Sequence, residues 1–254
     1  MREYVMLIPL FLLCFLAAHV VKMFRLYLVL LEQKIPFDRF VILYLKTTLV
    51  NLVIPFKLGE VFRIFSITKE VHKLQIGILS VLVDRFFDTA ALLILLIPIQ
   101  LFITKNFTVV AGLLLLAVFM LALGYKAFLS TYAYINKYLI QNKKSRRSLL
   151  ALKGIEVMKE WYDYCKQLII GRSPLIVIFS CAGWILDICV LFVLGKYFDI
   201  IFDIEEFSRY IAAIFLSGKS DLLNWYCIIG ALILLIGTVL GYLYIGVRRF
   251  RERV

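Results

Sequence analysis

The sequence predicts an all-α polytopic membrane protein. Three observations lead to this fold class. The 254-residue chain is 63% hydrophobic and only 18% charged, with a mean hydropathy of +0.94. Apolar runs of about 18 or more residues recur along it, which is the signature of membrane helices. Lys and Arg gather between these runs, so membrane topology explains the net charge of +12, and nucleic acid is not an expected partner.

Six segments are long and apolar enough to predict membrane crossings. The second segment has only about 17 residues, which is near the lower limit for a span. The first resembles a signal peptide, but its apolar run continues past any plausible cleavage point, so we expect it to be retained. We therefore expect residues 1–254 to form a single integral membrane domain. The predicted spans are 4–30, 40–56, 76–102, 108–129, 174–198 and 222–246.

The distribution of Lys and Arg orients these spans. Eighteen of them fall in segments 1–3, 56–75, 130–173 and 247–254. Only five fall in 31–39, 103–107 and 203–221, which alternate with the first group along the chain. Positive residues favour the cytoplasmic side. The pattern predicts a multi-pass protein of the cell (plasma) membrane with both its N- and C-termini in the cytoplasm.

Segment 146–170, RRSLLALKGIEVMKEWYDYCKQLII, has a helical apolar stripe. Basic residues precede the stripe, so the segment predicts an amphipathic helix lying on an anionic cytoplasmic leaflet. The alternative is a solvated connector helix. The apolar positions are Leu152, Ile155, Met158, Tyr162, Cys165 and Ile169.

Segment 51–63, NLVIPFKLGEVFR, interrupts apolar sequence with a proline, a glycine and three charges. Pro55 removes a backbone donor and Gly59 permits turns, so together they predict a broken or re-entrant segment. Unsatisfied backbone is not tolerated against lipid, and a break at membrane depth implies burial or a wet cavity. Glu60 would lie in the first turn of a new helix and share a face with Arg63. The alternative is that Pro55 simply ends a span at the cytoplasmic surface.

Ionisable residues also lie inside three predicted spans. Asp84, Arg85 and Asp88 occupy the third, Lys46 the second and Asp187 the fifth. Such residues normally face a bundle interior, pair with one another and mark a pathway. They predict a hydrophilic groove that suits a zwitterionic or phosphate-bearing group, because Arg and Lys bind phosphate. The alternative is one buried Arg–Asp pair that locks two helices together.

These patterns assign a role to each candidate residue. The predicted head-group ligands are Lys46, Asn51, Lys57, Glu60, Arg63 and Arg85; the structural break is Pro55 with Gly59; and Asp84, Asp88 and Asp187 pair with cations or carry a proton. No metal and no cofactor are expected. The chain has no CxxC pair and only two histidines, and it lacks a GxxxxGK[ST] loop for ATP.

The order of these residues resembles the membrane domain of the lysylphosphatidylglycerol synthase and flippase-like family. An Asn stands before a Pro, GE-x-x-R follows, and about twenty residues later come an acid, an Arg, two hydrophobics and an Asp. Arg25 resembles the Arg near the end of that family's first helix. The family usually has Glu where Asp84 stands, and region 205–226 lacks the second Pro- and Gly-rich break common in it. The matching residues are Asn51, Pro55, Gly59, Glu60, Arg63, Asp84, Arg85 and Asp88.

The resemblance implies handling of a lipid head group without lysyl transfer, because no soluble synthase domain is present. We expect membrane lipids, anionic or glycan-linked, as partners, with binding and translocation of an aminoacyl phospholipid or polyprenyl-linked glycan that would enter laterally near Pro55. One alternative is a non-transporting accessory subunit that presents a lipid carrier to a glycosyltransferase in envelope glycan assembly. Another is a membrane-embedded transferase with Glu60 or Asp88 as base. No nucleophile–base pair is recognisable, so enzymatic activity is not expected.

Overall fold

The chain folds into helices throughout the residues that the computed structural model describes, which are 2–54, 58–105, 107–142, 146–216 and 219–251. A 3₁₀-helical turn, Leu31–Gln33, follows the first helix, and a π-helical segment, Ile99–Thr104, extends the fourth. The helices are α1 (Arg2–Leu30), α2 (Phe37–Val53), α3 (Leu58–Val71), α4 (Leu74–Pro98), α5 (Val109–Asn142), α6 (Arg146–Ile169), α7 (Ser173–Tyr197), α8 (Ile204–Leu216) and α9 (Asp221–Arg251).

The predicted fold class is confirmed: the protein is an all-helical, multi-pass membrane protein. Four stretches of the described helices are long and apolar enough to cross a bilayer: Leu7–Gln33, Val109–Gln141, Ser173–Tyr197 and Asp221–Arg248. Helix α4 has a comparable length of 25 residues but carries the charged Asp84–Asp88 stretch. Each of these five helices matches a predicted span. The prediction of one domain over the whole chain stays a prediction.

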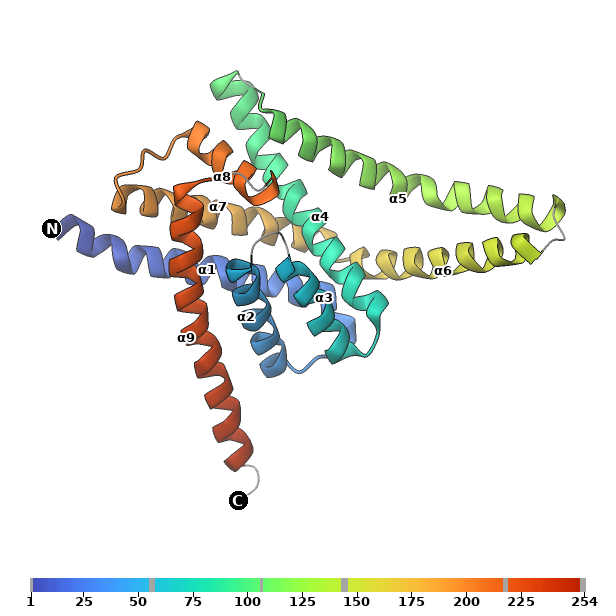
Figure 1. Ribbon diagram of the computed structural model, residues 1–254, viewed down its shortest axis with the longest axis horizontal. Coiled ribbons are helices and arrows are strands. Elements are labelled where there is room, and N and C mark those ends of the chain that lie inside the picture. The colour runs from blue at the N-terminus through green and yellow to red at the C-terminus, as the bar shows by residue number, and fades with distance from the viewer. Residues whose placement is uncertain (1, 55–57, 106, 143–145, 217–218, 252–254) are drawn as a thin grey trace.

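The predicted span 40–56 corresponds to helix α2, and whether α2 crosses the bilayer stays a prediction. Helix α2 has 17 residues, which is about 25 Å at 1.5 Å per residue and less than the roughly 30 Å hydrocarbon core. Helix α3 returns antiparallel to it, and Arg39 at the start of α2 pairs with Glu70 near the end of α3, at 3.7 Å. The two helices therefore form an antiparallel hairpin (Figure 1), and its predicted re-entrant position in the membrane stays a prediction. Pro55 and Lys57 lie outside the described residues.

The hairpin also changes which loops share a side. Asp38 in the first turn of α2 forms an ion pair with Arg248 near the end of α9. Glu32 pairs with Arg172 at the start of α7, at 2.9 Å. Segment 31–39 thus lies at the same end of the molecule as the basic C-terminal segment, not opposite to it as the charge pattern predicted. An α2–α3 hairpin that does not cross the membrane makes the number of crossings odd, which argues against the predicted placement of both termini in the cytoplasm; that placement stays a prediction.

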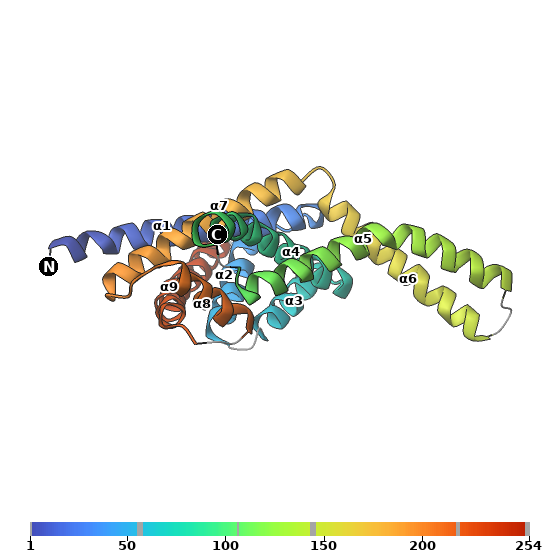
Figure 2. The same ribbon diagram turned by 90° about the horizontal axis from the view of Figure 1, so that it is seen from above.

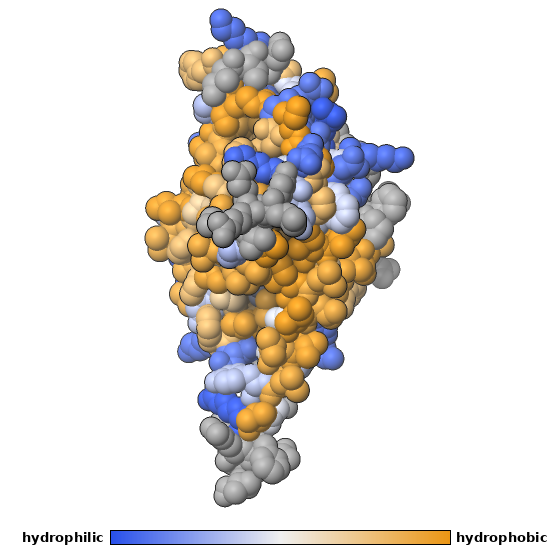
Figure 3. Space-filling view, turned by 90° about the vertical axis from the view of Figure 1, so that its left-hand side faces the viewer, coloured by the Kyte–Doolittle hydropathy of each residue, from blue (hydrophilic) through white to orange (hydrophobic). Residues whose placement is uncertain are grey.

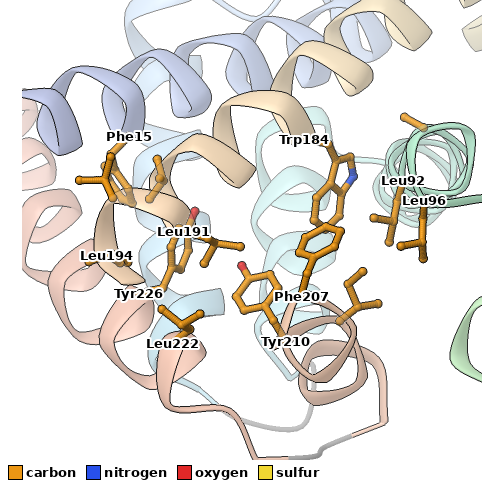
Figure 4. Packing of buried hydrophobic residues seen from close by; sticks show 14 of the residues in the cluster. Phe15, Leu92, Leu96, Trp184, Leu191, Leu194, Phe207, Tyr210, Leu222 and Tyr226 are labelled. Carbon is orange, nitrogen blue, oxygen red and sulfur yellow. The ribbon is translucent and has the colours of Figure 1, made fainter. Parts of the chain in front are cut away.

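Two helix pairs cross to make the body. Helices α1 and α7 lie side by side, and α2 lies alongside α9 at a steep angle to them (Figure 1). Where the pairs meet, α4 and α8 close a core of aromatic and aliphatic side chains (Figure 4). Its centre is Phe15, Leu191 and Tyr226, which are at most 5% exposed.

Helices α5 and α6 form a long hairpin that extends away from this body (Figures 1 and 2). Tyr162 of α6 stacks on Tyr125 and Phe128 of α5, with ring centroids 4.9 and 4.8 Å apart. Helix α6 covers nearly all of the predicted amphipathic segment, so the helix is confirmed, while its place at the membrane interface stays a prediction. Helix α5 continues 13 residues beyond the predicted span end at residue 129.

Helix α8 lies in segment 203–221, which the sequence analysis treated as a loop. Phe207, Tyr210 and Ile211 face the core, whereas Glu205 and Arg209 are exposed. The helix has only 13 residues with three charges among them, so it falls below the length and hydropathy of a span. With α9 it forms a second helix–interruption–helix unit, which the absence of a Pro- and Gly-rich signature had argued against.

The surface agrees with a lipid-facing body. On the face shown in Figure 3, apolar residues cover the middle and hydrophilic residues gather toward the two ends. Large side chains such as Leu232, Leu240 and Leu243 on α9 are 58–61% exposed. Exposed leucines at this density along a whole helix are expected against hydrocarbon rather than water.

Candidate functional site

A cavity of about 730 Å³ lies inside the body, between the α2–α3 hairpin and the α8–α9 unit. Helices α1, α4 and α7 complete its walls. Among the described residues that line it, four basic and four acidic side chains have formal charges that cancel, and His19 also lines the cavity. They are Lys22, Arg25, Arg63 and Arg85 against Glu60, Asp84, Asp88 and Asp187.

Arg25 of α1 is at the centre of the charged cluster. It is 2% exposed, and its Nε donates to Oδ1 of Asp84 on α4 at 2.7 Å. Its Nη1 donates to Asp88 one turn further along α4 and to the hydroxyl of Ser180 on α7, at 3.3 Å for the latter. Because Asp84 and Asp88 are four residues apart, one guanidinium reaches both carboxylates. Arg25 thereby ties α1, α4 and α7 together and has little freedom to bind anything else.

The hairpin tip contributes a second arginine. Arg63 of α3 is 3% exposed; its Nη1 lies 3.5 Å from Asp84 and 3.8 Å from Glu60, and its Nη2 donates to the hydroxyl of Thr48 at 3.3 Å. Asn51 of α2 donates to Glu60 at 3.1 Å. Glu60 is in the first turn of α3, where the helix dipole favours an acid. The first two turns of α3 therefore place charged side chains inside the molecule.

Gly59 makes this tip possible by close packing. It lies in the first turn of α3, where its backbone angles are ordinary. A Cβ atom there would come 2.3 Å from the Cα of Asn51 and 2.5 Å from its Oδ1. Only glycine allows α2 and α3 to approach this closely. The sequence analysis assigned Gly59 to the break itself, and the structure places it just inside the returning helix.

Arg85 is the most accessible of the four cations. Its side chain is 40% exposed, although it pairs with Asp84 at 2.8 Å, with Asp88 at 3.5 Å and with Glu60 at 3.5 Å. Arg25 and Arg63 are enclosed, with side chains 2% and 4% exposed. Arg85 is therefore the cation of the four that is most open to a ligand.

A second ion pair lies on the other side of the cavity. Lys22 of α1 pairs with Asp187 of α7, and the hydroxyl of Tyr226 on α9 donates to the same carboxylate at 3.4 Å. Lys22 is one turn before Arg25 on the same face of α1, and it keeps 21% of its side chain exposed. The predicted charge in the fifth span is therefore paired with a cation that the sequence analysis did not single out.

Aromatic and neutral polar groups fill the space between the charges. The indole of Trp184 donates to the backbone carbonyl of Asp88 at 3.0 Å, and Nδ1 of His19 is hydrogen-bonded to the Tyr44 hydroxyl at 3.1 Å. Trp184 and the two tyrosines of α8 and α9, Tyr210 and Tyr226, line the cavity and are labelled in Figure 4. Within the described part of the chain, three buried nitrogens on its wall have no hydrogen-bond partner: Nε2 of His19, Nε of Arg63 and Nε of Arg85. Buried polar atoms normally have hydrogen-bond partners, so water or a ligand in the cavity would supply the partners of these nitrogens.

The structure brings together most of the predicted site residues. All of the following line the cavity: Asn51, Glu60, Arg63, Asp84, Arg85, Asp88 and Asp187. Lys46 does not; it is exposed on α2, with its Nζ over the ring of Phe62 at 5.3 Å. Pro55 and Lys57 cannot be placed, as they fall outside the described residues.

Several lining residues escaped the sequence analysis. Lys22 had a usable signal, because an ionisable residue within an apolar first span is a functional candidate. Thr48, Trp184, Tyr210 and Tyr226 had none, since a hydroxyl or an aromatic ring in a membrane helix is unremarkable by itself. The alternative of a single dry Arg–Asp pair does not describe this site, because eight charged side chains surround an open cavity.

Fold and site together define a class: a multi-pass membrane protein that holds a charge-balanced cavity within its helical body. Comparison with known families agrees with this class. The family description for the lysylphosphatidylglycerol synthase TM region matches residues 2–203. The chain belongs to this family. No curated protein and no solved structure matches the chain.

Proposed function

We propose that this protein binds the polar head group of an amphipathic membrane lipid in the charged cavity and translocates the lipid across the cell membrane. The observation that carries the proposal is the cavity itself. Burying ionised groups in a membrane is costly, and a dry lock between helices would need no space beside it. Here about 730 Å³ remains open next to Arg85.

The charge balance indicates which head groups fit. Four cations and four anions already compensate one another among the described lining residues, so a strongly charged head group would leave the cavity with excess charge. A zwitterionic group satisfies both signs. Its phosphate would lie against Arg85, where two parallel hydrogen bonds can form, and its amine against Glu60 or Asp88. An aminoacyl phospholipid or a polyprenyl-linked glycan with compensated charge meets this condition.

The arrangement of helices supports movement rather than presentation alone. The cavity lies between two units that each consist of a helix, an interruption and a second helix, and transporters commonly place substrate sites at such discontinuous helices. The alternative role, an accessory subunit for a glycosyltransferase, was favoured by the lack of a second Pro- and Gly-rich break in the sequence. No energy source is implied by the chain, and transport down a lipid gradient needs none.

The test is lipid movement in vesicles made with the purified protein. Fluorescent phosphatidylethanolamine in the outer leaflet is bleached by an impermeant reductant, so translocation appears as exchange with the protected inner pool. We expect the wild-type chain to accelerate exchange and Arg85→Met to reduce it by about tenfold or more, the scale of losing a charge-assisted pair. Arg39→Met, which removes a 60%-exposed side chain at the other end of α2, is the matched control.

Three outcomes separate the proposal from the alternatives. Vesicles in which the wild-type chain moves no lipid contradict translocation. A changed lipid mass after addition of an aminoacyl or glycosyl donor would indicate a transferase. Unmoved lipid together with co-purification of a glycosyltransferase would indicate an accessory subunit.

A further inference from the structure

An apolar groove of about 460 Å³ runs between α2 and α9, beside the charged cavity. Its walls are the last two turns of α2 and the 228–235 stretch of α9, and among the described residues they carry only aliphatic side chains. The stretch on α9 covers two turns, about 10 Å at 1.5 Å per residue. Val53 and Leu232 are 63% and 58% exposed, so the groove is open toward the surrounding lipid.

The groove and the cavity adjoin. Val53, the last residue of α2, and Ile54, which follows it, line both. On α9 the change is equally abrupt: Cys227 lines the cavity and the next residue, Ile228, lines the groove. The charged cavity and the apolar groove therefore meet at the end of α2.

Small residues on α9 shape this groove. A Cβ atom on Gly230 would come within 3.1 Å of the Phe15 ring and 3.2 Å of Leu52, so α9 is pressed against α1 and α2 on that face. Ala231, the adjacent position, lines the groove and leaves it open. A large side chain at position 231 would fill the groove without entering the tight contact at Gly230.

We propose that this groove holds a hydrocarbon chain of the same lipid whose head group the cavity binds; the inference rests on the proposed function. Apolar helix surfaces gain little by exchanging one hydrocarbon contact for another in a membrane. The head group therefore supplies the affinity, and the groove fixes where the chain leaves the protein. With its chain beside α2 and α9, the lipid keeps its tail in the bilayer while its head group lies against Arg85.

The first test reads chain position directly on the wild-type protein. Phosphatidylethanolamine with a diazirine on one acyl chain is placed in nanodiscs with the protein, illuminated, and its crosslinks are mapped by mass spectrometry. We expect crosslinks at 228–235 to exceed those at 239–243, a largely exposed part of the same helix that lies outside the groove. Arg85→Met should remove the excess, because the head group positions the chain. Equal labelling of the two stretches overturns the inference.

The second test fills the groove. Ala231→Trp should lower phosphatidylethanolamine translocation by about tenfold or more, the scale of overpacking at a single position. Leu240→Trp, at a 60%-exposed position on the same helix, should leave it unchanged. Ala231→Phe repeats the test with less bulk if the tryptophan variant does not fold. Transport by both position-231 variants at the wild-type rate overturns the inference.

The two proposals fail in different ways. If the wild-type chain moves no lipid but its crosslinks concentrate at 228–235, translocation is contradicted and the groove remains a chain-binding site. If lipid moves but labelling is even and Ala231→Trp has no effect, translocation stands and the chain follows another route.

Discussion

Replacing Arg25 with methionine is the sharpest test of the buried charge network. Arg25 is 2% exposed and pairs with Asp84 and Asp88, which are 1% and 13% exposed. Methionine keeps much of the side-chain length but removes the charge. Asp84 then retains Arg63 and Arg85 at 3.5 and 2.8 Å, whereas Asp88 retains only Arg85 at 3.5 Å.

The size of the effect follows from what remains. Removing one partner of a buried ion pair costs about 3–5 kcal/mol, because the other charge is left buried and uncompensated. Asp84 keeps two partners, so we expect the lower end, about 3 kcal/mol of unfolding free energy. Arg85→Met provides the contrast. Its side chain is 40% exposed, and we expect a loss of about 1 kcal/mol or less.

The assay is unfolding of the purified protein by SDS in mixed micelles, followed by far-ultraviolet circular dichroism. A second variant, Arg25→Met with Asp88→Asn, restores the balance of charge and should recover part of the loss, with a coupling of about 1 kcal/mol or more. Equal stability losses for Arg25→Met and Arg85→Met, or no recovery in the double variant, would refute the view that Arg25 neutralises the α4 carboxylates.

Three further predictions concern the hairpin, the cavity wall and the topology. Gly59→Ala should abolish lipid translocation and lower the unfolding temperature, because the added Cβ would overlap the Cα of Asn51 at 2.3 Å; unchanged transport would contradict the close packing. Trp184→Phe removes one hydrogen bond, to the Asp88 carbonyl, and should cost about 1 kcal/mol in the same SDS assay. Reporters fused to the two ends of the chain should report opposite sides of the membrane, because α1 crosses to the end that α9 also reaches; a shared side would show that the α2–α3 hairpin is wrongly placed.

Membrane class and local motif were readable from the sequence because both are local properties. Hydropathy depends on neighbours along one helix, so all six predicted spans correspond to helices of the structure, five of them to helices of 25 residues or more. The GE-x-x-R and D-R-x-x-D spacings likewise place charges on one helix face, and the Glu60–Arg63 and Arg85–Asp88 pairs follow from that spacing.

The depth of a segment in the membrane and the direction in which the chain continues could not be predicted in the same way. Segment 40–56 looks like a short span, and only its packing against α3 shows that the chain turns back. The ion pairs of Arg39 and Asp38 join residues 31 and 210 positions apart, and no local pattern encodes such contacts. Helix α8 was missed for a related reason: its charged face excludes it as a span, and its burial depends on α7 and α9.

The sequence by itself determined that this chain is a helical membrane protein. It also showed that acidic residues and arginines lie within apolar helices, where an unpaired charge is costly. Only the tertiary structure decided which acid meets which base: Lys22 with Asp187, Arg25 with Asp84 and Asp88, and Lys46 with none of them. The physical reason is that the cost of a buried charge is a property of one residue, which composition reveals. Its compensation is a property of the space between helices, which exists only once they have packed.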